Sequence, residues 1–158
     1  MKKLFPIILV VILLIMPFSF TTFAEAPEVI ISETTEYFED GSSVTTTITQ
    51  QINKVSRAVT TVSGSKVKTG RNSNGQIEYK FQVNGTFSVN VGISETCTAV
   101  SCGASELANG WSLDSSTTSK SGNTASATGI LKYKVLFVTT HTIEIPLSLS
   151  CDANGTLS

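Results

Sequence analysis

The sequence predicts an all-β protein, a small antiparallel β-sandwich of two sheets that carries a weakly structured acidic hairpin on its N-terminal side. From Gln76 to Val91, every odd-numbered position is apolar or glycine and every even-numbered position is polar. A β-strand imposes this period of two. The same alternation returns at 131–137 and 141–151, and no segment shows a helical stripe. These observations predict strands with one buried and one wet face.

The N-terminus is typical of a secretory signal peptide. Lys2 and Lys3 precede an apolar run that reaches Phe20, and small residues follow up to Ala24. This order of basic, apolar and small segments predicts cleavage after Ala24, with residues 1–24 removed. Two prolines interrupt the run, which is also slightly short for a bilayer span. We therefore expect a secreted, extracellular protein whose mature form makes no membrane contact.

The charge of the mature chain excludes a nucleic-acid partner. Removing residues 1–24 takes away two lysines and no acid, so the formal charge falls from −1 to −3. Nucleic-acid binding requires a concentrated basic face. The acidic residues gather in 25–40 and the basic ones in 54–80. We expect a solvated acidic leader, with docking of that leader on the basic sheet as the alternative.

Residues 25–58 form the first predicted unit after the signal. Val29–Phe38 leads into a Glu39–Ser42 turn, in which Asp-Gly suits a tight reversal, and a Thr-rich strand follows from Val44. A two-stranded hairpin is marginal by itself, so it must dock or stay mobile. Residues 53–58 are predicted to be a linker, and Arg57 is a candidate processing site within it.

The sandwich proper is predicted at 59–158, about the usual size of one such domain. A short strand at 63–69 turns through Asn72–Gly75 into the long strand at 76–91. Sixteen residues exceed a usual strand, so Gly85 is predicted to bend it from one sheet into the other. Residues 96–109 are predicted to be rich in loops.

The second half of this domain is predicted to hold three further strands. A short strand at 111–114 is followed by a turn at 119–123 and by a strand at 125–137. Val138–Thr140 is predicted to turn the chain into the last strand, 141–151. Pro146 lies inside that strand and cannot donate a ladder hydrogen bond, which predicts an edge position.

Three cysteines in an exported chain predict one disulfide and one remaining thiol. The chain-entropy model assigns about 4 kcal/mol to a Cys97–Cys151 loop and about 2 kcal/mol to a Cys97–Cys102 loop. Cys151 also shares the apolar face of its strand. We therefore favour Cys97–Cys151, with Cys102 free or paired between chains. Cys97–Cys102 is the alternative, and metal binding is a weak one.

The aromatic residues and the single histidine are predicted to be structural. Tyr79, Trp111 and Tyr133 share parity with apolar neighbours, which favours core packing over a sugar platform. His141 begins an apolar face, and no nucleophile or carboxylate pair accompanies it, so an enzyme is not expected. We expect no metal and no cofactor. The candidate binding surface is the polar face of the long strand: Glu78, Lys80, Gln82, Asn84, Thr86, Ser88 and Asn90.

Short segments along the mature chain resemble a family of small secreted proteins of unknown function from Gram-positive, largely clostridial, bacteria. The segments that carry the resemblance follow the acidic leader and are 57–58, 64–66, 72–75, 85–87, 97–98, 111–112, 119–125, 127–129 and 149–158. The resemblance implies export and a small β module, with Cys97 and Cys151 as the usual cysteine pair. It implies no activity.

These observations together predict a secreted, non-enzymatic binding module at the cell envelope. Its expected partner is an envelope glycan or a surface protein, and the oligomeric state stays open. One alternative is a bacteriocin-like antagonist in which residues 25–57 are a pro-segment. Another is a structural component of a surface layer or biofilm.

Overall fold

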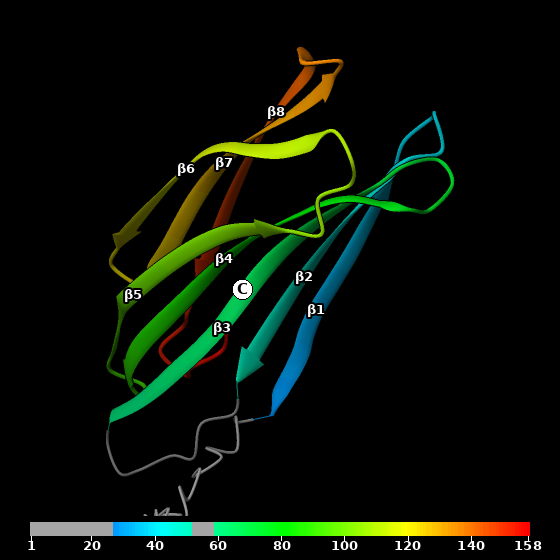
Figure 1. Cartoon of the computed structure of the whole chain (residues 1–158). Coiled ribbons are helices and arrows are strands. Elements are labelled where there is room, and N and C mark those ends of the chain that lie inside the picture. Colours follow the sequence, from blue (N-terminus) through cyan, green and yellow to red (C-terminus); the bar gives the residue numbers. More distant parts are fainter. Residues whose placement is uncertain (1–26, 52–58) are drawn as a thin grey trace, which may run out of the picture.

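The computed structural model describes residues 27–51 and 59–158, and their regular structure is antiparallel β throughout (Figure 1). A five-stranded sheet has the order β1-β2-β3-β4-β5, and a three-stranded sheet has the order β6-β7-β8. The predicted all-β sandwich of two sheets is confirmed. The strands are β1 Glu28–Tyr37, β2 Ser43–Gln51, β3 Val59–Arg71, β4 Ile77–Asn90, β5 Ser94–Ser105, β6 Trp111–Ser121, β7 Thr124–Val135 and β8 Val138–Ser150.

The predicted long strand is β4, and its apolar face builds the core. Phe81, Val83, Phe87 and Val89 are each 0% exposed. They pack against buried residues of the small sheet, such as Leu131. The even-numbered side chains of β4 are half-buried on the outer face. The alternation therefore identified both the strand and its buried face correctly, because a period of two is a local property of the strand backbone.

Gly85 does not carry β4 from one sheet into the other, so that prediction is wrong. β4 pairs with β3 over its whole length and with β5 from Lys80 to Asn90. A Cβ added at Gly85 would lie 2.7 Å from ring carbons of Phe87. The glycine therefore makes room for the Phe87 ring. The irregularity of β4 is a register shift against β5 between Thr86 and Phe87.

The N-terminal hairpin is part of the large sheet. β2 pairs with β3 from Ser43↔Arg71 to Gln51↔Ser63, so the ladder continues without interruption into the sandwich. Ile48 of β2 is buried, at 7% exposure. The hairpin predicted at 25–58 thus docks through backbone hydrogen bonds. The predicted cleavage site at Ala24 and processing site at Arg57 lie outside the described residues.

Three predicted boundaries in the second half differ from the structure. The strand predicted at 111–114 continues to Ser121 as β6, so the turn predicted at 119–123 is confined to residues 122–123. Most of the predicted loop-rich stretch at 96–109 is β5, and Cys97, Val100, Cys102 and Ala104 face the core. A register shift against β4 between Cys97 and Ala99 interrupts the alternation of β5. The last hairpin turns at Leu136–Phe137 and not at Val138–Thr140. Neither Leu nor Phe is a turn-forming residue, so no local signal marks this turn.

The predicted edge position of the Pro146 strand is confirmed, since β8 is the last strand of its sheet. The C-terminal tail folds back against the end of this strand. Ser150 and Ser158 exchange backbone hydrogen bonds of 2.9 Å, and Leu157 is buried in the core. Pro146 removes one donor from the β8 edge, and the tail covers this edge at Ser150.

Candidate functional site

The described part of the chain forms a pocket of about 610 Å³ at one end of the sandwich. Residues of the β1–β2 turn, the β3–β4 turn and the small sheet line this pocket. Figure 1 shows both turns at the same end of the molecule. The residues that line the pocket are Phe38, Asp40, Ser42, Ser43, Val44, Gly70, Arg71, Asn72, Ser73, Glu78, Tyr79, Trp111, Tyr133, His141 and Ile143. Both sheets contribute, so the pocket exists only in the folded sandwich.

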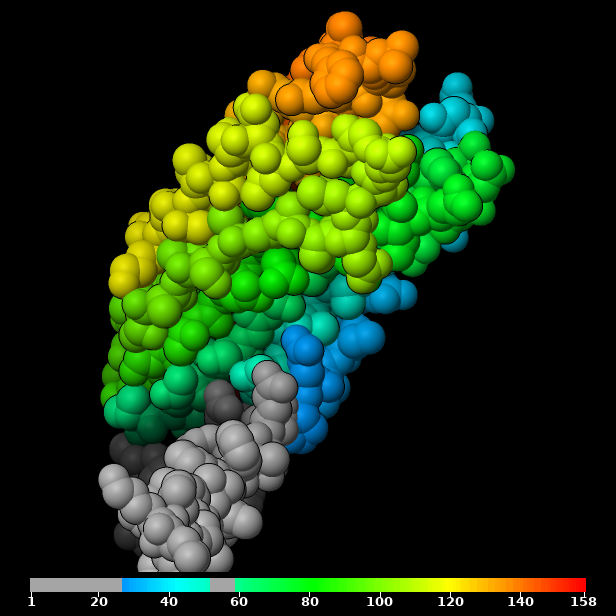
Figure 2. All heavy atoms as spheres, in the orientation of Figure 1, coloured from blue at the N-terminus to red at the C-terminus, as the bar shows by residue number. Residues whose placement is uncertain are grey.

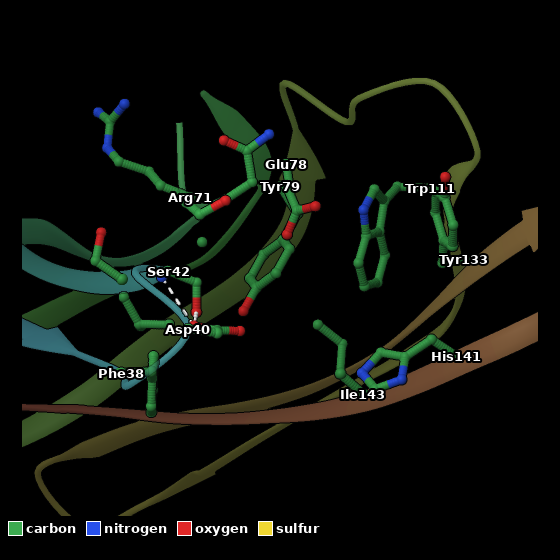
Figure 3. A pocket seen from close by; sticks show the side chains of 15 residues that line it. Phe38, Asp40, Ser42, Arg71, Glu78, Tyr79, Trp111, Tyr133, His141 and Ile143 are labelled. Atoms are coloured by element: carbon green, nitrogen blue, oxygen red, sulfur yellow. Dashed lines mark hydrogen bonds between the residues drawn. The ribbon is translucent and has the colours of Figure 1, made fainter. Parts of the chain in front are cut away.

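Aromatic rings form one side of this pocket. The ring centroid of Trp111 lies 5.4 Å from that of Tyr79 and 5.4 Å from that of Tyr133, in tilted arrangements. His141 stands edge-on to Trp111 at 6.2 Å. The four residues come from β4, β6, β7 and β8. Figure 3 shows Trp111, Tyr133 and His141 grouped together, facing Asp40 and Ser42 across the pocket.

Backbone contacts around Gly110 hold Trp111 in position. The N–H of Trp111 donates to the carbonyl of Ala108 at 3.0 Å, and the N–H of Lys134 donates to the carbonyl of Gly110 at 2.8 Å. Gly110 has a φ of 94°, and a Cβ there would lie 2.5 Å from the Tyr133 ring. Only glycine suits both the backbone conformation and this close approach. Trp111 therefore enters β6 from a fixed turn.

Tyr79 connects the aromatic side to the large sheet. Its ring covers Gly70 of β3 so closely that a side chain at Gly70 would overlap it. Burial, and then the neighbouring charge of Glu78, raises the pKa of Tyr79. The phenol therefore stays protonated at neutral pH and can donate a hydrogen bond into the pocket.

Polar groups form the opposite side. The Asp40 carboxylate accepts hydrogen bonds from the Ser42 hydroxyl at 2.6 Å and from the Ser42 N–H at 2.9 Å. These bonds, the hydroxyl contribution first, lower the pKa of Asp40. Arg71 donates to the carbonyl of Gly75 at 3.0 Å. The pocket thus offers aromatic faces on one side and fixed acceptors and donors on the other.

The structure bears out only part of the prediction that the aromatic residues and His141 pack in the core. Tyr79 and Trp111 pack against the core cluster, yet they are only half-buried, as is Tyr133. His141 is exposed. Parity indicated correctly which side of each strand these residues occupy. It could not show that the two sheets separate at this end, which leaves the rings facing a pocket.

The polar face of β4, predicted as a binding surface, lies on the outer side of the large sheet. Its members largely bond to neighbouring strands. Lys80 forms an ion pair of 2.7 Å with Glu106, and Asn84 donates to Ser101 at 3.2 Å. Glu78 is the member that also lines the pocket. The remaining predicted positions are half-buried on this face: Gln82, Thr86, Ser88 and Asn90.

The predicted Cys97–Cys151 disulfide is not formed in this structure, where the thiols of Cys97, Cys102 and Cys151 are free. The sulfur of Cys97 contacts the carbonyl of Ala99 at 3.4 Å. Burial, and then the carboxylates of Asp152 and Glu95, raises the pKa of Cys151 to about 11. Both buried thiols are therefore held in the neutral form.

Residues 27–51 and 59–158 contain no group of three or more His, Cys, Asp or Glu side chains arranged to hold a metal ion. The same residues form no helix long and apolar enough to cross a membrane.

No family model, curated protein or solved structure matches this chain. The protein is therefore classified by its fold and its pocket alone. This is an antiparallel β-sandwich with an aromatic-walled pocket at one end.

Proposed function

We propose that the protein is an exported, non-enzymatic binding module that holds a glycan of the cell envelope in the aromatic pocket. The observation that carries the proposal is the Tyr79–Trp111–Tyr133 group, with ring centroids 5.4 Å apart, facing polar groups across an open pocket of about 610 Å³. A sugar ring has apolar C–H faces and polar edges. Aromatic rings cover the faces, while carboxylate, amide and guanidinium groups bond to the hydroxyls.

Several features support binding over catalysis. Two charged groups of the pocket are engaged with neighbours, Asp40 with Ser42 and Arg71 with Gly75. Glycoside hydrolysis requires two carboxyl groups placed on either side of one bond, one of them with a raised pKa. The pKa of Asp40 is shifted in the opposite direction. Export rests on the sequence of residues 1–24.

The only tryptophan of the chain is Trp111, so its fluorescence reports directly on the pocket. Soluble disaccharide-peptide fragments of peptidoglycan and N-acetylglucosamine oligomers are the probes. We expect a saturable change in emission that is lost in Tyr133→Ala. Asn84→Ala, on the polar face of β4, is the matched control and should bind like the wild type.

Two outcomes would contradict the proposal. One is the absence of any emission change or calorimetric signal with these fragments, with teichoic acid and with host glycans. The other is loss of binding in Asn84→Ala with retention in Tyr133→Ala, which would assign the site to the polar face of β4.

A structural role in a surface layer is the second candidate, and the position of β1 favours it. Among the described residues, β1 pairs with β2 alone and is exposed over nearly its whole length. Val29, Ile30 and Ile31 are exposed on it. An open edge of this kind can pair with another chain. Growth of light scattering in a monomeric preparation would support this role.

Export would also make the Cys97–Cys151 disulfide possible. The backbone N–H groups of the two cysteines donate to carbonyls of the β6–β7 turn. That of Cys97 donates to Gly122 at 2.8 Å, and that of Cys151 donates to Asn123 at 3.1 Å. Oxidation would release two protons and pass two electrons to a thiol–disulfide exchange partner. Thiol titration of the secreted protein in denaturant would then find one thiol, whereas unbonded cysteines would give three.

A further inference from the structure

The β7–β8 hairpin ends in an apolar tip, which we define as Val135, Leu136, Phe137 and Val138. Leu136 is 86% exposed and Phe137 is 100% exposed, and the two valines are 45% and 64% exposed. Figure 2 shows this tip, in orange, at the outer limit of the pocket end of the molecule. Single exposed apolar residues are common on protein surfaces, but four consecutive ones at a protruding turn mark an interaction site.

The backbone of the tip is also strained. Leu136 has a φ of 46° and Phe137 a φ of 70°, so both lie in the left-handed region. A two-residue hairpin loop with both φ values positive is the type I′ turn, which prefers Asn-Gly. Bulky side chains disfavour this conformation. The fold thus keeps two residues that are unfavourable for the turn and that bury nothing within the described molecule.

The charged residues that precede the tip in the sequence are basic. No Asp or Glu occurs between Asp114 and Glu144, whereas Lys132 and Lys134 directly precede the tip. Lys132 forms an ion pair of 2.9 Å with Asp114, so its charge is partly neutralised. Lys134 is exposed. A protruding apolar end followed by a cation matches an anionic lipid surface, in which the acyl chains lie beneath the charged headgroups.

We propose that this tip inserts into the lipid–water interface of an anionic membrane. Leu136 and Phe137 enter the acyl boundary, and Lys134 meets the phosphate headgroups. The contact is peripheral and reversible, since four apolar residues do not span a bilayer. It departs from the sequence-based expectation of no membrane contact. It also stands independently of glycan binding, although it would hold the pocket, which lies at the same end, close to the surface.

The test uses the full mature chain and sedimentation with vesicles. Vesicles of phosphatidylcholine with phosphatidylglycerol are compared with vesicles of phosphatidylcholine alone. We expect stronger partitioning to the anionic vesicles, weakened by salt. The double variant Leu136→Asn with Phe137→Gly suits the turn, so its fold should persist, while partitioning falls by about tenfold or more.

Ile93→Ser is the matched control, because Ile93 is 76% exposed at a turn at the opposite end of the sandwich. It should partition like the wild type. Lys134→Gln should weaken binding to anionic vesicles alone. Trp111→Ala, with glycan binding followed by calorimetry because the fluorophore is removed, should lose glycan binding yet keep vesicle binding, which separates the two proposals.

Three results would overturn the proposal. They are no partitioning of the wild type, equal partitioning of the wild type and the double variant, and a dimer in sedimentation equilibrium that the double variant dissociates. The last result would assign the tip to self-association, with Phe137 as its anchor.

Discussion

The β3–β4 and β7–β8 turns lie at the same end of the sandwich (Figure 1). The first is built from polar residues and glycine, and the second from bulky apolar residues. In the first, the Asn72 side-chain oxygen accepts the N–H groups of Asn74 and Gln76, each at 3.0 Å. Gly75 takes the positive φ of 76°. In the second, Leu136 and Phe137 take positive φ values with no side-chain hydrogen bond to relieve them within the described residues.

The residues of the β3–β4 turn favour its backbone conformation, whereas those of the β7–β8 turn disfavour theirs. The residues at 72–75 supply what the backbone needs, so their sequence is explained by stability. Those at 136–137 disfavour the left-handed backbone conformation that they adopt, and they expose apolar surface to water. Local strain that the fold tolerates in this way is typical of functional positions.

The double variant Leu136→Asn with Phe137→Gly should have the largest effect on stability. It removes left-handed strain at two bulky residues, so we expect the free energy of unfolding to rise by about 2 kcal/mol. Urea unfolding of the soluble protein, with an unchanged m-value, is the measurement. A destabilised variant would show instead that the apolar pair contributes packing to the hairpin, and the contrast between the two turns would fail.

Gly75→Leu places a bulky residue at a positive φ in the β3–β4 turn. A Cβ at Gly75 meets nothing within 4 Å, so only backbone strain opposes the change. We expect the free energy of unfolding to fall by about 1 kcal/mol. Gly103→Leu is the control, since that glycine also has open space but lacks a positive φ. An equal fall in the free energy of unfolding for both variants would mean that backbone strain does not explain the contrast between the two turns.

The smallest expected effect on stability comes from Asp40 in the β1–β2 turn at the same end. Because the Ser42 hydrogen bonds lower the pKa of Asp40, this carboxylate stabilises the fold above its unfolded pKa. The contribution is lost as the pH falls through the lower, folded-state pKa. We expect an NMR titration to give an Asp40 midpoint below that of an ordinary aspartate. Ser42→Ala should raise the midpoint, and an unchanged midpoint would contradict the assignment of cause.

Much of the fold followed from local pattern, and most of the site did not. Alternation identified β4 and its buried residues, and Pro146 marked β8 as an edge. The role of Gly85 was missed because its cause is the position of the Phe87 ring. The turn at Leu136–Phe137 was missed because it lacks turn-forming residues. The pocket was missed because no stretch of sequence contains it.

The sequence by itself determined the class of the fold and the inward faces of β4, β7 and β8, because a side-chain period of two is set within a single strand. The tertiary structure decided that Tyr79, Trp111, Tyr133 and His141 meet at one pocket, since four strands of two sheets supply them. It also decided that Phe137 projects from the same end. Parity fixes the direction of a side chain. Only the packing of two sheets decides whether that direction ends in the core, in a pocket or in solvent.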